Sequence, residues 1–353
     1  MGTGPTPRAA DIVEDGWIVP GFVDMHAHGG DGSTFDTANE GEIQDIVSLH
    51  RSRGSTTLVA SIDSGPIREM KSAVTRLAGF VEDGLLAGVH LEGPFISQLR
   101  PGSHSREVLQ DPSPKLVDDL VDCAPDIIRM ITIAPELDGG IQAVRSIAGS
   151  GIIAAVGHTD APYQTTIEAI DAGATVATHI WNAMRPVHHR EPGPIAALLE
   201  DERVTCELIN DGLHLHDAVA ALTIETAGRC RVALISDATA VGLASGNYVV
   251  GGKSLTVGSN GAVRDHNGAI AGGNHPLATG FTRAAKRFGI EAASTMASTT
   301  PARALGLGDV GSIAKGNKAD LVFLTPEFEV KGVLTAGSPV RAHRSSSEYG
   351  SNS

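Results

Sequence analysis

The sequence has few cysteines, few aromatic residues and no long run of apolar residues. Its three cysteines, Cys123, Cys206 and Cys230, are odd in number and widely spaced, which argues against a disulfide framework and suits a reducing compartment. No stretch approaches the roughly 20 uninterrupted apolar residues of a membrane span. The opening segment, MGTGPTPRAADIVEDG, also lacks the basic-then-apolar pattern of a signal peptide. We therefore expect a cytoplasmic protein that does not enter a membrane.

Basic residues are also in short supply. The 27 Lys and Arg are outnumbered by 41 Asp and Glu, for a formal net charge of -14, so nucleic acid and anionic membranes are not expected as main partners. An anionic substrate would need local donors such as Arg190, nearby imidazoles or backbone N–H groups. Hydrophobic residues make up 41% of the 353 positions, which allows one barrel-sized domain and a smaller second one.

Short apolar segments rich in Val and Ile alternate with helix-like stretches along the chain. This alternation predicts right-handed βαβ units and a parallel sheet covered by helices. Most of the strands run directly into a histidine or an acid, and a (β/α)8 barrel collects its chemistry at these carboxyl ends. A doubly wound open sheet is the alternative, but it would gather ligands at one switch point. The predicted strands are Phe22–His28, Thr56–Ile62, Leu86–Glu92, Ile127–Glu136, Ile152–His158, Thr175–Ile180, Val204–Asp211 and Val232–Asp237. The predicted helices are Glu40–Arg53, Ile67–Glu82, Pro114–Cys123, Ile141–Ala148, Tyr163–Asp171, Pro194–Leu199 and Ala218–Ala227.

After the last of these strands the pattern changes to hairpin-like alternation around Gly and Asn turns, in NYVVGGKSLTVGSNGAVRDHNGAIAGG. Helices are predicted at His275–Phe288 and Glu291–Leu305, and GSIAKGNKADLVFL predicts a further turn and strand. We expect this antiparallel material to pair with residues 1–19. The predicted fold is α/β, a (β/α)8 TIM barrel with a small β-sandwich domain built from both chain ends. The predicted boundaries are 20–307 for the hydrolase barrel, 1–19 (a short N-terminal part) plus 308–343 for the β domain, and 344–353 for a frayed tail.

Five of the strand-end residues predict a metal centre. His26 and His28 stand two apart on one strand, so both side chains can bind one ion. Glu92, His158 and His179 end three further strands and together suggest a three-ligand site with a position open for water or substrate. A lone histidine on an apolar strand is more often a hydrogen-bonded residue of the core than a ligand, and the alternative for Glu92 is a salt-bridged glutamate of the barrel. Nitrogen and oxygen ligands without cysteine suit zinc, iron, manganese or cobalt, and we expect zinc, with one or two ions per subunit.

Asp237 and His214 are the candidate catalytic residues. Asp237 ends the last strand, where it could bind a second metal ion, act as general base, or do both. Capping of a turn is the alternative. His214 follows the seventh strand and could donate a hydrogen bond to a substrate carbonyl oxygen as it becomes an oxyanion. Asp211 is expected only to orient this loop.

The segment HIWNAMRPVHHREPG, residues 179–193, is rich in hydrogen-bond donors. The Asn182 side chain, the Ala183 backbone N–H and Arg190 would suit a phosphate or carboxylate. An ordinary exposed loop would have the same composition, and spacing alone makes Arg190 equally a surface arginine. The same alternatives apply to His104 in RPGSHS.

The motifs HLEGP, GHT, NAM and HHREPG, in this order, resemble those of the N-acetylglucosamine-6-phosphate deacetylases of the amidohydrolase superfamily. The similarity covers about residues 18–325, from PGFVDMHAHG to GSIAKGNKADLV. It implies metal-dependent deacetylation of N-acetyl-D-glucosamine 6-phosphate, in amino-sugar catabolism and cell-wall recycling, by a homodimer. The alternatives are another amidase or deaminase of the superfamily, or a non-catalytic sugar-phosphate-binding protein, which would need neither Asp237 nor His214.

The resemblance also implies roles for individual residues. Glu92, His158 and His179 would bind the main ion, and His26 and His28 would add a second one bridged by Glu92. The remaining roles fall to Asp237 as metal ligand and acid/base, His214 at the acetamide carbonyl, Asn182, Ala183 and Arg190 at the 6-phosphate, and His104 near the sugar. Part of the phosphate pocket would come from the neighbouring subunit. Many relatives have Ser where this chain has Gly273.

Overall fold

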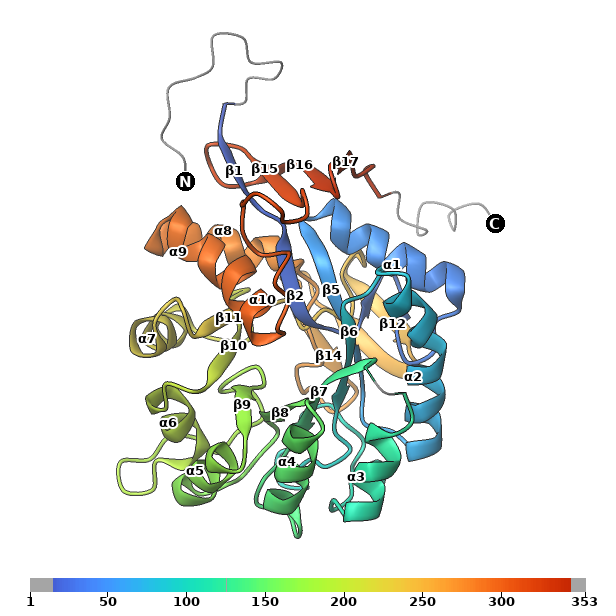
Figure 1. Cartoon of the computed structure of the whole chain (residues 1–353), viewed down its shortest axis with the longest axis vertical. Helices are drawn as coiled ribbons and strands as arrows, with labels where there is room; N and C mark the ends of the chain where they lie inside the picture. Colours follow the sequence, from blue (N-terminus) through green and yellow to red (C-terminus); the bar gives the residue numbers. More distant parts are fainter. Residues whose placement is uncertain (1–14, 125, 344–353) are drawn as a thin grey trace.

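Eight parallel strands form the centre of the molecule and lie side by side in chain order (Figure 1). The computed structural model describes residues 15–124 and 126–343. An isolated bridge between Ala27 and Ala238 brings the last strand back to the first, and the Asp237 N–H donates to the His26 carbonyl at 3.0 Å. The predicted (β/α)8 barrel is therefore confirmed. Its strands are β2 (Phe22–Ala27), β5 (Ser55–Ile62), β6 (Gly88–Glu92), β7 (Ile128–Ile133), β8 (Ile153–Val156), β9 (Ala174–Ala177), β10 (Thr205–Ile209) and β11 (Val232–Ile235).

Helices surround the barrel, and each of the eight barrel strands is followed along the chain by one of them (Figure 1). The first helix begins with a capping box, in which the Asn39 side chain accepts the Glu42 N–H and the Glu42 carboxylate accepts the Asn39 N–H. Along the second, Met70, Val74 and Leu77 are buried at a spacing of three or four residues, which makes one face apolar. The helices are α1 (Glu40–Ser52), α2 (Ile67–Glu82), α3 (Pro114–Val121), α4 (Gly140–Gly149), α5 (Tyr163–Asp171), α6 (Gly193–Glu200), α7 (Asp217–Ala227) and α8 (Leu277–Phe288), with a short 3-10 turn at Arg106–Val108.

The amino end of the barrel is closed by a helical segment that follows α8. It consists of α9 (Ile290–Ser294), a π-helical turn (Thr295–Thr299) and α10 (Thr300–Ala304), where a single helix was predicted. Ala302 and Leu305 pack against the barrel interior, in one cluster with Met25, Met130 and other side chains of the strands. Because the interior is packed from this end, only the opposite end is left for chemistry.

The two chain ends meet in one small antiparallel sheet. β1 (Trp17–Pro20) pairs with β15 (Leu321–Leu324), and β16 (Val330–Thr335) and β17 (Ser338–Pro339) continue it. A small β domain from both ends is thus confirmed, although the described residues form a single sheet, next to α1, in place of a sandwich. Residues 1–14 and the expected frayed tail at 344–353 lie outside the described residues. The predicted domain boundaries stay a prediction.

The hairpins after β11 do not join that sheet, so this part of the prediction is wrong. β12 (Gly246–Val250), β13 (Lys253–Val257) and β14 (Val263–Asp265) form a separate three-stranded sheet. Its apolar side chains, among them Leu255, Val257 and Val263, are buried in a cluster of their own. The hairpins therefore cover their apolar face without a strand from the N-terminus. A short ribbon of β3 (Gly29–Gly30) and β4 (Ser33–Thr34) follows β2.

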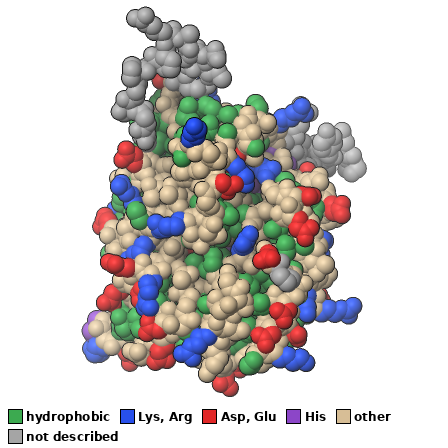
Figure 2. Space-filling model, viewed as in Figure 1, with side chains coloured by type: hydrophobic (Ala, Val, Ile, Leu, Met, Phe, Trp, Pro, Cys, Tyr) green, Lys and Arg blue, Asp and Glu red, His purple; other side chains and the backbone are tan. Residues whose placement is uncertain are grey.

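The described surface carries charges of both signs. Figure 2 shows Lys and Arg side chains interspersed with Asp and Glu over one face of the molecule. In the part of the chain that the structure describes, no helix combines the length and the apolar character needed to cross a bilayer.

Replacing Phe281 by alanine is expected to destabilise the fold by about 3–5 kcal/mol, because it empties a fully buried site. Phe281 on α8 packs its ring against Phe22 on β2, with ring centroids 4.7 Å apart. Urea denaturation followed by circular dichroism measures the loss. Leu222→Ala on α7, where the side chain is 50% exposed, is the control and should change stability by no more than about 0.5 kcal/mol. Equal effects of the two variants would show that the α8–β2 contact does not anchor the barrel.

Candidate metal centre

Glu92 lies at the centre of a cluster of imidazoles at the carboxyl ends of the strands. Its Oε1 is 2.8 Å from His179 Nε2 and 3.0 Å from His158 Nε2. The three side chains are buried and come from the ends of three different strands. The structure therefore brings together the three residues predicted as the main metal site, and their ligand atoms are close enough to hold one ion.

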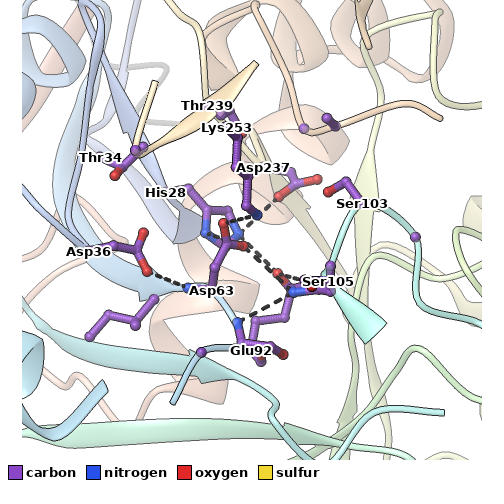
Figure 3. Close-up of a pocket in the computed structure, with 18 of the residues that line it drawn as sticks. His28, Thr34, Asp36, Asp63, Glu92, Ser103, Ser105, Asp237, Thr239 and Lys253 are labelled. Carbon is purple, nitrogen blue, oxygen red and sulfur yellow. Dashed lines mark hydrogen bonds and ion pairs between the residues drawn. The ribbon is translucent and has the colours of Figure 1, made fainter. Parts of the chain in front are cut away.

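A second group lies on the other side of the same carboxylate. His26 Nε2 and His28 Nε2 are 3.1 Å apart, and Asp237 Oδ1 is 3.4 Å from the first and 3.5 Å from the second. Glu92 Oε2 is 3.1 Å from His28 Nε2. Figure 3 shows His28, Asp237 and Glu92 converging on one space from different elements. Glu92 thus lies between two ligand groups, as a carboxylate shared by two ions would.

These donors fit divalent cations. Buried imidazole nitrogens face each other in two pairs, His26 with His28 and His158 with His179, each at 3.1 Å. One proton can lie between only one such pair of nitrogens, whereas a metal ion accepts lone pairs from several nitrogens at once. Burial raises the pKa of Glu92, but the surrounding imidazoles, His104 and His26 foremost, hold it well below its usual range. Glu92 is therefore a carboxylate, and the set of nitrogen and oxygen donors without cysteine suits zinc and its first-row neighbours.

The backbone at three of these residues is in the left-handed region. φ is +47° at His158, +27° at His179 and +47° at Asp237. For residues other than glycine this costs on the order of 1–3 kcal/mol each and needs support from the surroundings. Part of that support is visible, since the Asp237 N–H donates to the His26 carbonyl and the His179 N–H to the Glu207 carboxylate. Backbone strain at three candidate ligands, each at the end of a different strand, marks the carboxyl end of the barrel as a functional site.

Sequence reasoning missed several carboxylates beside the metal centre, namely Glu207, Asp63 and its neighbour Asp36. Glu207 on β10 is fully buried, and its Oε2 lies 3.0 Å from His26 Nδ1. Asp63 follows β5 and forms an ion pair with Lys253 of β13 (Figure 3). An acid inside the strand TCELI was the available signal for Glu207, because a charge within a buried strand needs a partner.

His214 and Asp211 form a hydrogen-bonded pair next to this cluster. His214 Nδ1 is 2.8 Å from Asp211 Oδ2, and the other Asp211 oxygen accepts the backbone N–H groups of Leu213 and His214. The expectation that Asp211 orients the loop agrees with these contacts. His214 Nε2 is buried and has no hydrogen-bond partner among the described residues, so this atom is available to a ligand.

A cavity of about 520 Å³ opens over the metal centre. Predicted substrate residues His104, Asn182, Ala183 and His214 line it. So do Asp237 and four residues of the metal centre, His28, Glu92, His158 and His179. Its other wall includes Asp63 and Lys253 and parts of the three-stranded sheet.

Arg190 is not brought into this cavity by its own chain. Its side chain is exposed, and its Nη1 lies 2.7 Å from His189 Nε2. The remaining predicted site residues do converge, so Arg190 is the exception.

A buried cluster of histidines and acids at the strand ends of a (β/α)8 barrel, below an open cavity, defines the class of metal-dependent hydrolases. The model of the Amidohydrolase family matches residues 17–340, and the chain belongs to this family.

Named relatives agree with that assignment. The N-acetylglucosamine-6-phosphate deacetylase of Bacillus subtilis (strain 168) is 34% identical, over 95% of this chain and 87% of the relative. The N-acetylgalactosamine-6-phosphate deacetylase of Escherichia coli O157:H7 is 32% identical, over 94% and 88%. The crystal structure of N-acetyl-D-glucosamine-6-phosphate deacetylase from Mycobacterium smegmatis matches with a TM-score of 0.93 and 42% identity, covering 96% of this chain and 92% of that one. The resemblance drawn from the motifs is confirmed.

The pKa of His214 should depend on Asp211. Burial lowers this pKa, but the hydrogen bond and charge of Asp211 outweigh burial and raise it above 6.5. A raised pKa in the folded state means that the pair stabilises the fold below the unfolded value and that this stability is lost as pH rises through the folded pKa. We expect Asp211→Asn to lower the His214 pKa and to weaken this pH dependence.

Ring-proton NMR titration, with denaturation at pH values from about 5 to 8, measures both effects. The exposed His216 ring, whose Nδ1 accepts the Ala218 N–H, serves as the internal control. An unchanged His214 pKa would show that the hydrogen bond with Asp211 does not govern its protonation.

Proposed function

We propose that this chain hydrolyses N-acetyl-D-glucosamine 6-phosphate to D-glucosamine 6-phosphate and acetate, in amino-sugar catabolism and cell-wall recycling in the cytoplasm. The observation that carries the proposal is the convergence of Asp237 and His214 on the cavity that contains the candidate metal centre. A proton carrier and a hydrogen-bond donor for a carbonyl oxygen thus face the same space. The names of the relatives supply the substrate class.

The residues proposed to hold metal divide into two groups. Glu92, His158 and His179 would hold the main ion, and His26, His28 and Asp237 would hold a second one, with Glu92 between them. One or two ions per subunit are compatible with these groups, with zinc expected first and iron, manganese or cobalt as alternatives. When bound, such an ion supplies water with a pKa lowered to about 7 and polarises the amide carbonyl.

The chain's own residues perform the proton transfers. Asp237 takes the proton from the attacking water and delivers it to the departing amine nitrogen, as a general base and then a general acid. His214, held through Nδ1 by Asp211, presents Nε2 to the carbonyl oxygen and donates to it as negative charge develops there. The raised pKa of His214 favours the protonated ring that this role requires.

The substrate's sugar and phosphate would lie against His104, Asn182 and Ala183, which line the cavity. Arg190 is exposed in its own chain, so we propose a homodimer in which Arg190 of one subunit reaches the phosphate in the cavity of the other. The motif resemblance, which implies a dimer with a shared phosphate pocket, is what supports this arrangement.

The phosphate assignment predicts a preference that depends on Arg190. Acetate release should be faster from the 6-phosphate than from N-acetylglucosamine. Arg190→Ala should raise KM for the phosphorylated sugar about tenfold or more with little change in kcat, because a hydrogen bond to a charged group contributes about 1.5–3 kcal/mol. The control is Arg145→Ala, exposed on α4. Equal use of the unphosphorylated sugar by the parent enzyme would contradict the assignment of the phosphate pocket. Faster use of the N-acetylgalactosamine epimer would show that the epimer, and not the glucosamine compound, is the substrate.

Asp237→Asn is expected to lower kcat by about 10²–10⁴-fold, because the amide cannot carry the proton. The ion at Glu92, His158 and His179 should remain, since none of these side chains is altered. Acetate release measures kcat, and elemental analysis of the purified variant measures the metal. Asp309→Asn, a substitution in an exposed ion pair with Lys318, is the control. Near-parental kcat in Asp237→Asn would exclude Asp237 as the proton carrier.

A further inference from the structure

We propose that Glu207 is a positioning residue that enables the chain to hold a second metal ion, acting through His26. The inference rests on the proposed function only in taking His26, His28 and Asp237 as a metal site. Glu207 lies on β10 with its side chain fully buried inside the barrel. Its Oε2 is 3.0 Å from His26 Nδ1 and also accepts the His179 backbone N–H at 3.1 Å. With Nδ1–H donated to Glu207, the Nε2 lone pair of His26 faces His28 and Asp237.

The four candidate imidazole ligands differ in what holds their other ring nitrogen. His158 Nδ1 contacts the Arg100 carbonyl at 3.0 Å. His28 Nδ1 and His179 Nδ1 have no hydrogen-bond partner among the described residues. His28 Nδ1 faces Asp63 Oδ1 only at 3.5 Å. His26 is therefore the one of the four whose Nδ1 hydrogen-bonds a carboxylate in the described structure. A carboxylate fixes the tautomer and makes the imidazole a stronger ligand than a carbonyl does.

The charge of Glu207 favours two ions over one. Glu92, Asp237 and Glu207 are 3%, 8% and 0% exposed, and together they carry more negative charge than one divalent ion balances. A buried charge without a counterion is costly. Glu207 Oε1 has no hydrogen-bond partner in the described part of the chain. Among the candidate metal-ligand side chains, Glu207 hydrogen-bonds that of His26. A second ion on His26, His28 and Asp237 offsets this excess.

A substitution by glutamine separates the charge from the hydrogen bonds. The same oxygen, Glu207 Oε2, accepts hydrogen bonds from His26 Nδ1–H and from the His179 N–H. An amide oxygen in its place therefore preserves the two hydrogen bonds. Titration of metal-free enzyme with Zn²⁺, followed by elemental analysis, should give two ions for the parent. Glu207→Gln should keep the tight ion and weaken the second about 10–100-fold, as is typical when such a partner is changed. Glu207→Asp, which keeps the charge, should recover part of the loss and serves if the glutamine variant does not fold.

Glu136→Gln is the matched control. Glu136 also lies at the catalytic end of the barrel and accepts a hydroxyl and a backbone N–H, from Thr159 and Asp160, but it contacts no imidazole. Its Zn²⁺ titration should match that of the parent. On a His26→Asn background, Glu207→Gln should weaken the second ion no further, because the two residues act as one unit.

The outcomes separate this inference from the proposed function. Parental affinity for the second ion in Glu207→Gln, equal weakening of both ions, or additive loss on the His26→Asn background each overturns the role of Glu207. A parent that binds only one ion also overturns it, yet could still release acetate. A parent with two Glu207-dependent ions and no acetate release would retain the role of Glu207 and refute the deacetylase.

Discussion

The contact of Glu92 with two groups of histidines is the interaction on which the rest of the site depends. A carboxylate that is 3% exposed is costly unless positive charge surrounds it. Each of its oxygens faces its own set of imidazole nitrogens, with His158 and His179 on one side and His26 and His28 on the other. The barrel allows this because the carboxyl ends of its strands converge on one point. Cations among these donors would turn an unfavourable burial into a stable one.

Much of the barrel could be predicted because its strands and helices alternate in a simple way. The predicted bounds of α2 and α5, Ile67–Glu82 and Tyr163–Asp171, are those observed. The strand pairing after β11 was harder to predict, because an alternating hairpin pattern does not show which strand each hairpin pairs with. β12 to β14 bury their own apolar cluster and stay next to the cavity. The π-helical turn at Thr295–Thr299 has no signal in periodicity.

The site was predictable to the extent that its residues stand at strand ends. His158, His179 and Asp237 could be named in advance, but the left-handed φ that aims them could not, since it is imposed by contacts from distant residues. Glu207 was missed because it lies inside a strand rather than at its end. Arg190 raises a different problem: its side chain is exposed in the described structure, and spacing alone does not distinguish an anion-binding arginine from a surface one.

The wall of the cavity adds a charge constraint that explains why Lys253 can lie near a metal centre. A lysine beside cations is unfavourable unless an acid offsets it. Burial lowers the pKa of Lys253, but its ion pair with Asp63 outweighs burial and raises it, and Lys253 in turn helps to hold the Asp63 pKa well below its usual range. Lys253 and Asp63 are therefore both charged, and their opposite charges nearly cancel. The negative charge that would attract metal is left to Glu92, Asp237 and Glu207. The pair also ties β13 to the end of β5, which holds the three-stranded sheet over the cavity.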